Sequence, residues 1–325
     1  MEEEKLEAPV QMEIAPAFSL KKGIWLNIVL FVITILSTFF VGISKSINFK
    51  YSEELAQNPQ STFDLVEKLR DPQVISLSII YVVVLLGILL GHELGHFLTC
   101  RYYKINATLP YFIPAPTLIG TLGAFIKIKS PITRKQQLFD IGVAGPLTGF
   151  ILSVPALVYG LSLSKSAPPI PHDEAFVYIL GEPLILKIFS AMIFKNIPAD
   201  YSIYLHPIAF AGWVGILVTA LNLFPVGQLD GGHVSYALLG KKSRNLTRFF
   251  LGVFIAMGIL FWVGWFIWAF LLFFLGLRHP RVLDEAAHLS PRRKFIGYVV
   301  ILIFILSFIP APIKGLNLFD ILKGF

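Results

Sequence analysis

The chain is poor in charge and has a single cysteine, and both shortages restrict what it can be. Charged residues make up 14% of its 325 residues, whereas a typical soluble domain has about 25%. The single cysteine, Cys100, excludes an internal disulfide and a cysteine-based metal cluster. The acidic start lacks the basic region that opens a cleavable signal peptide, so we expect a short solvated, cytosolic tail over residues 1–22.

Long apolar runs dominate the rest of the sequence. Hydrophobic residues make up 55% of the chain, the mean hydropathy is +0.73, and several runs reach the roughly 20 residues that span a bilayer. The sequence therefore predicts an all-α polytopic membrane protein, a bundle of about six transmembrane helices. The predicted spans are about 23–43, 75–99, 138–163, 205–224, 247–277 and 295–313.

One of these runs leaves the helix count open. Residues 247–277 are either one long helix or a tight hairpin of two short spans with a bend near Gly258 or Gly264. The basic segment 278–294 follows, and the preference of basic loops for the cytoplasm favours the hairpin, which would give seven spans. A further interfacial helix is expected near 176–194.

The net charge of +7 is not read as a nucleic-acid signal. The most basic cluster, Lys241, Lys242 and Arg244, has no interleaved aromatic residues. Basic loops of a membrane protein set its topology and contact anionic lipid. The loop 100–137 is richer in lysine and arginine than the connection 164–204, so it is expected inside. The expected partner is the lipid bilayer, with no nucleic acid.

The sequence HELGH at 92–96 ends the second predicted span and carries the chemistry. On a helix, His92 and His96 share one face and can hold one ion. Neutral imidazole binds zinc at about 2.0–2.1 Å, and the adjacent Glu93 can act as general base towards a zinc-activated water. Gly91 and Gly95 remove side-chain bulk, so another backbone can approach. Ionisable residues within an apolar span indicate a functional site.

A catalytic zinc site needs a third protein ligand and one open position. The ends of the second and fourth spans lie on the same membrane side, which brings Asp230 and His233 towards the HELGH segment. Asp230 is favoured and His233 is the alternative. Other downstream candidates lie in loops or at the opposite helix end; these are Glu174, Glu182, His206, Asp284, Glu285 and His288.

The segment between the fourth span and Asp230 is expected to be irregular. Pro225 ends the helix, and residues 225–232 contain three glycines. Irregular backbone at membrane depth must be buried or line a wet cavity, and a hydrolase that uses water needs such a cavity. Asn222 can bind a substrate carbonyl or the oxyanion, or it can form a hydrogen bond between helices.

HExxH followed by NxxPxxxxDG, which spans Asn222 to Asp230 and Gly231, resembles the site-2 protease family of intramembrane zinc metalloproteases. The resemblance implies zinc ligation by His92, His96 and Asp230, one zinc per chain, catalysis by Glu93, and a role for Asn222. It covers a catalytic core at 75–240. This core is preceded by a first transmembrane helix and loop at 23–74 and followed by C-terminal transmembrane helices at 241–325.

The same resemblance implies an activity and a place. The chain is expected to be an endopeptidase that cleaves transmembrane or membrane-anchored proteins in regulated intramembrane proteolysis. It is expected to be a multi-pass protein of the cell membrane, or of a plastid membrane in a eukaryote. A small membrane-associated β segment over Gly120–Lys129 would hold the substrate extended. The third span begins with Gly142-Val-Ala-Gly145-Pro146, which also looks like family sequence and is expected to serve close helix packing.

Two other classes of function remain. A prenyl-protein peptidase would need a downstream glutamate ligand in a helical motif, whereas Glu285 lies in a loop without that motif. A catalytically inactive metal-binding scaffold or a transporter is the alternative. A transporter would need ionisable residues along several spans, and an inactive relative would be expected to lose Glu93, which is intact.

Overall fold

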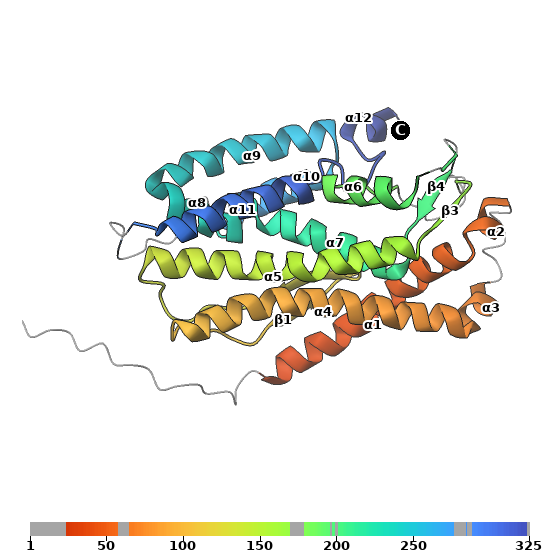
Figure 1. Ribbon diagram of the computed structural model, residues 1–325, viewed down its shortest axis with the longest axis horizontal. Coiled ribbons are helices and arrows are strands. Elements are labelled where there is room, and N and C mark those ends of the chain that lie inside the picture. Colours follow the sequence, from red (N-terminus) through yellow and green to blue (C-terminus); the bar gives the residue numbers. More distant parts are fainter. Residues whose placement is uncertain are drawn as a thin grey trace, which may run out of the picture.

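The structure, a computed structural model, describes residues 24–57, 65–169, 179–195, 197–198, 201–275, 284 and 288–323. Its helices lie side by side along the long axis of the molecule (Figure 1). Within the described residues, four helical segments are long and apolar enough to cross a membrane: α1 (Ile24–Lys50), α4 (Pro72–Tyr102), α5 (Lys135–Ser162) and Asp230–Leu260. The prediction of an all-α polytopic membrane protein is confirmed.

The fourth of these segments contains α8 (Asp230–Leu239), a 3-10 turn and α9 (Ser243–Leu260). The remaining elements are shorter. They are α2 (Ser52–Gln57), α3 (Leu65–Arg70), β1 (Tyr111–Pro114), β2 (Thr121–Phe125), β3 (Lys165–Ala167), α6 (Leu184–Ile193), β4 (Ser202–Tyr204), α7 (Pro207–Asn222), α10 (Gly264–Leu275), α11 (Pro291–Ser307) and α12 (Leu318–Lys323).

The ambiguous run at 247–277 is two helices. The chain leaves α9 after Leu260 and begins α10 at Gly264. A side chain at Gly258 would come within 2.8 Å of the Phe266 ring, so the two helices fold back on each other. The hairpin alternative is therefore the one the structure adopts.

Two further expectations need adjustment. The interfacial helix expected near 176–194 is α6, which begins only at Leu184 because Pro183 precedes it in extended conformation; residues 170–178 lie outside the described part. The irregular stretch expected at 225–232 is shorter, because α8 already begins at Asp230.

Three helices begin with the same local signal, a capping side chain followed by proline. Asp71 caps α4 by accepting a hydrogen bond from the Gln73 N–H, 2.8 Å away. His206 caps α7, and Ser290 caps α11. Proline at the first helical position has no N–H to leave unsatisfied. Asp71 also bonds Lys50 and Tyr51, and these bonds, led by that from Lys50, lower its pKa to about 2.

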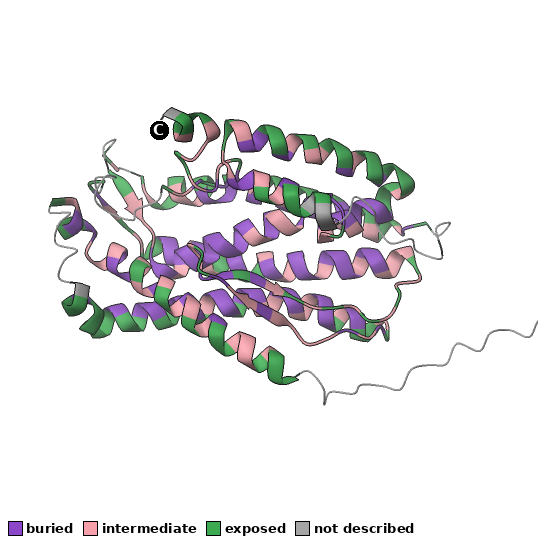
Figure 2. Cartoon of the chain, turned by 180° about the vertical axis from the view of Figure 1, so that it is seen from behind, coloured by how far each residue is buried: buried purple, intermediate pink, exposed green. Residues whose placement is uncertain are grey.

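The core is formed by α4, α5 and α7, whose backbones lie close together. Buried residues concentrate on these central helices, while the outward faces of α1 and α9 are exposed (Figure 2). Glycines permit the approach: a side chain at Gly95 would come 2.6 Å from the Ala144 carbonyl, and one at Gly160 would come 2.1 Å from the Ala209 nitrogen. Small residues at helix interfaces allow such contact within a membrane.

A small antiparallel sheet follows the HELGH helix, as expected. β1 pairs with β2 in a register that sets Tyr111 opposite Phe125. The strand is shorter than the expected Gly120–Lys129, because it ends at Phe125 and only an isolated bridge continues at Ile128. On one side it is held by α1, where the Ser37 hydroxyl donates to the Gly120 carbonyl at 2.7 Å. The pair β3–β4, at the right-hand end of the molecule in Figure 1, was not predicted.

Candidate metal centre

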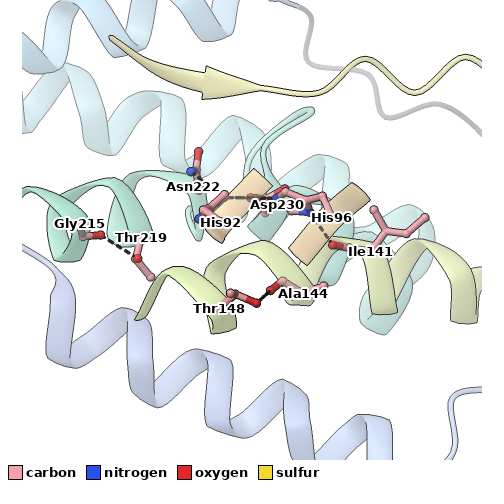
Figure 3. Close-up of polar contacts among 9 residues, drawn as sticks. All are labelled: His92, His96, Ile141, Ala144, Thr148, Gly215, Thr219, Asn222 and Asp230. Carbon is pink, nitrogen blue, oxygen red and sulfur yellow. Dashed lines mark hydrogen bonds and ion pairs between the residues drawn. The ribbon is translucent and has the colours of Figure 1, made fainter. Parts of the chain in front are cut away.

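The two histidines of HELGH lie one helical turn apart in the last third of α4. His92 and His96 are both buried, and their Nε2 atoms are 3.2 Å apart. Both rings therefore point at one position (Figure 3). The spacing of four residues, which predicted that both histidines share one helix face, produces this common direction.

Asp230 joins the histidines from the first residue of α8. Its Oδ2 atom lies 3.3 Å from His92 Nε2 and 3.2 Å from His96 Nε2. The glycines that follow make this turn feasible. A side chain at Gly231 would come 2.0 Å from the Leu223 carbonyl, and one at Gly232 would come 2.4 Å from the Gly227 carbonyl.

The three donor atoms fit a zinc ion. A tetrahedral zinc ion with ligands at about 2.0–2.1 Å separates them by about 3.3 Å, and the three separations here are 3.2, 3.3 and 3.2 Å. The His96 Nδ1–H donates to the Ile141 carbonyl at 2.7 Å, which leaves the lone pair of Nε2 facing the centre. His92 Nδ1 is buried and has no hydrogen-bond partner among the described residues.

Helix α5 presents a glycine face, formed by Gly142, Gly145 and Gly149, to this centre. A side chain at Gly145 would come 2.1 Å from His96 Nε2, and one at Gly149 would come 2.9 Å from His92 Nδ1. The sequence indicated a helix-packing role for Gly142-Val-Ala-Gly145-Pro146; the structure places Gly145 of this segment against the His96 imidazole and adds Gly149 against the His92 imidazole. Gly95 receives the α5 backbone as expected, whereas the neighbour of Gly91 is the Leu152 side chain.

Glu93 and Asn222 lie beside the three donors. Glu93 is buried at 6% exposure and lies outside the three-residue donor group. Its carboxylate lies near the backbone of Ile126, just after β2. The Asn222 side-chain nitrogen, at the end of α7, lies 3.3 Å from His92 Nε2 (Figure 3).

The other candidates from the sequence do not join this group. His233 lies one turn further along α8, against Gly142, and is absent from the donor set. Glu182 lines a cavity near the start of α7, and His206 caps that helix. Two candidates lie in the segment before α11. The backbone of Asp284 forms an isolated β-bridge with Arg134, and the His288 carbonyl accepts a hydrogen bond from Gln136. Glu174 and Glu285 are outside the described residues.

An ion pair that the sequence did not reveal ties three helix ends together behind the centre. Arg293 of α11 donates to both carboxylate oxygens of Asp140, at 2.9 and 2.7 Å. Tyr103, which follows α4, also donates to Asp140. Asp140 directly precedes Ile141, whose carbonyl orients His96. The pair therefore fixes the second turn of α5 against the helix that carries both histidines.

The substitution Asp140→Asn is expected to weaken zinc binding by roughly tenfold, because losing a group that supports a metal ligand typically lowers metal affinity by about this factor or more. Zinc affinity would be measured by competition with a chelating dye. The matched control is Asp71→Asn, which breaks the Lys50 ion pair at the other end of α4. Equal zinc affinities in the two variants would contradict the positioning role of Asp140.

Comparison with known proteins identifies relatives of the region that contains these residues. Residues 80–265, which include all five site residues, match the model of peptidase family M50. Probable zinc metalloprotease EGY1, chloroplastic, of Arabidopsis thaliana is 34% identical over 71% of this chain and 42% of its own length. Probable zinc metalloprotease EGY2, chloroplastic, of Oryza sativa subsp. indica is 29% identical over 79% and 46%. The matched region is thus less than half of each relative. No solved structure matches the chain.

Proposed function

The chain belongs to peptidase family M50, and on that premise we propose that it is an intramembrane zinc metalloendopeptidase. The observation that carries the proposal is the set of three donor atoms from His92, His96 and Asp230, spaced as a tetrahedral zinc ion requires. A buried glutamate beside them supplies the base that such chemistry needs.

Each residue of the site has a distinct task in this proposal. His92, His96 and Asp230 would hold the ion, which would supply a Lewis acid and lower the pKa of water towards about 7. Glu93 accepts the proton of the attacking water and returns it to the leaving amine. The Asn222 amide, next to His92, donates a hydrogen bond to the substrate carbonyl as charge develops on its oxygen.

The proposed substrates are transmembrane or membrane-anchored proteins, cleaved in regulated intramembrane proteolysis. β2 is an edge strand of its two-stranded sheet within the described residues. The backbone of Ile126, the residue after it, lies near the Glu93 carboxylate. A peptide segment added along β2 would therefore pass beside the base with its main chain extended. A substrate helix must unwind locally to do so.

The proposed location is the cell membrane or, in a eukaryote, a plastid membrane, the latter because both relatives are named as chloroplastic. The alternative of an inactive metal-binding scaffold or a transporter gains no specific support. Glu93 is retained and buried within reach of the donor group, which favours hydrolysis.

The test compares wild type with Asp230→Ala and His233→Ala, all as full-length protein in detergent. We expect about one zinc per chain and cleavage of a transmembrane model substrate in wild type. Asp230→Ala is expected to lose most of its zinc and its cleavage, because two imidazoles alone leave the site one protein ligand short. His233→Ala should keep both.

Metal analysis and a gel-based cleavage assay give the two readouts. Stoichiometric zinc in Asp230→Ala with loss of zinc in His233→Ala would move the third ligand to His233. No zinc in wild type under any loading condition would refute the proposed enzyme.

A further inference from the structure

A cavity of about 500 Å³ lies at the end of the molecule remote from the start of α5 and α11. It is bounded by the last turns of α1, by α6, by β4 and by the first turn of α7. None of the five residues of the metal centre lines it. Its polar lining includes Lys45, Asn48, Glu182, Ser190, Tyr201 and Lys314.

The charge of this lining is predominantly positive. Among the described residues of the lining, Lys45 and Lys314 are accompanied by one carboxylate, that of Glu182. The Lys45 ammonium lies 4.7 Å from the centre of the Phe210 ring, a contact with an aromatic face rather than with an anion. In the portion of the chain that the structure describes, neither lysine is within ion-pair distance of a carboxylate. The cavity therefore offers two cationic donors for an anionic ligand.

The position of the cavity fits the headgroup level of a bilayer. It lies where membrane-crossing helices end, and Tyr201 and Tyr204 of its wall are residues of the kind enriched at membrane interfaces. Lysine near a helix end extends its ammonium towards this level. The remaining wall is apolar and includes Ile179, Leu186 and Phe210, which suits the glycerol and the first methylenes of a lipid.

We propose that this cavity binds a phosphate group, as carried by the headgroup of an anionic membrane lipid, through Lys45 and Lys314. Basic pockets between transmembrane helices are suited to such headgroups. Glu182, Asn48 and Ser190 add hydrogen-bonding groups for headgroup hydroxyls. A polyol headgroup such as phosphoglycerol matches two lysines and one glutamate better than a choline headgroup does.

The test uses the full-length protein and reads binding rather than proteolysis, so its outcome is independent of the proposed function. The chain is reconstituted with phosphatidylglycerol or with phosphatidylcholine, returned to detergent, and examined by native mass spectrometry. A second arm adds inorganic phosphate to lipid-free protein and measures binding by calorimetry. The variants are Lys45→Met and Lys314→Met. The matched control is Lys187→Met, which removes a lysine from the exposed side of α6 outside the cavity.

We expect wild type and Lys187→Met to retain phosphatidylglycerol and not phosphatidylcholine. Each cavity variant should retain roughly tenfold less, the effect of losing one charged hydrogen bond. Binding of inorganic phosphate alone, lost in the same two variants, would keep the phosphate site and assign it to a free anion. Equal retention in all variants, or no binding of either probe to wild type, would overturn the proposal.

Discussion

Replacing Glu93 with glutamine is expected to lower peptide-bond cleavage by roughly thousandfold, because general-base catalysis contributes about that much. Zinc content should stay near one per chain, since Glu93 lies outside the donor group of His92, His96 and Asp230. Glutamine keeps the size of the side chain but cannot accept the proton. Cleavage of a transmembrane model substrate and metal analysis on the same preparation give the two numbers.

Glutamine is the appropriate substitution because Glu93 is buried and lies near Ile126, the residue after β2. Alanine there would open a void and would confuse loss of the base with loss of packing. Wild-type cleavage in Glu93→Gln would remove Glu93 as the base. Loss of zinc together with cleavage would make Glu93 part of the metal site instead.

The parts of the site that the sequence predicted rest on short-range rules. Four residues separate His92 from His96, and helical geometry alone sets both rings on one face. The prediction of Asp230 also needed the number of membrane crossings between the second and fourth spans, which sets the ends of both spans on the same side of the membrane. The structure sets Asp230 within 3.3 Å of both histidines, as that count led us to expect. Its role as ligand stays a prediction.

The parts that were not predicted depend on contacts between distant segments. The hydrogen bond from His96 to the Ile141 carbonyl joins residues 45 positions apart, and the Asp140–Arg293 pair joins residues 153 apart. No periodicity or motif encodes such a pairing. β3 and β4 escaped prediction for a related reason: each has three residues, too few to show an alternating pattern.

The glycine face of α5 was predicted only in part. Its sequence, Gly142-Val-Ala-Gly145-Pro146, indicated close packing, but not what it packs against. In the structure Gly145 faces the His96 imidazole, and Gly149, one turn further along α5, faces the His92 imidazole, so these two glycines set the space available to both rings. At this interface the absence of a Cβ on the α5 glycines allows close helix packing and also leaves room for the two imidazoles. Helix packing and the geometry of the site therefore depend on the same residues.

Alanine at Gly145 is accordingly expected to weaken zinc binding at least roughly a hundredfold, the upper range for changes next to metal ligands. Its Cβ would come 2.1 Å from His96 Nε2, so the ring must move by more than the spread of about 0.2 Å within which zinc–ligand distances fall. Alanine stabilises a helix by up to about 1 kcal/mol relative to glycine, so intrinsic helix propensity does not oppose the change. Any loss therefore reports the clash.

A series of three alanine variants separates the site from general helix effects. Gly149→Ala, whose Cβ would lie 2.9 Å from His92 Nδ1, should weaken zinc less than Gly145→Ala does. Gly87→Ala on α4 meets nothing within 4 Å and should bind zinc as wild type does. Zinc affinity and thermal unfolding, both measured in detergent, would rank the variants. An unchanged affinity in Gly145→Ala would mean that α5 moves away from His96 at little cost, and that its glycines serve packing alone.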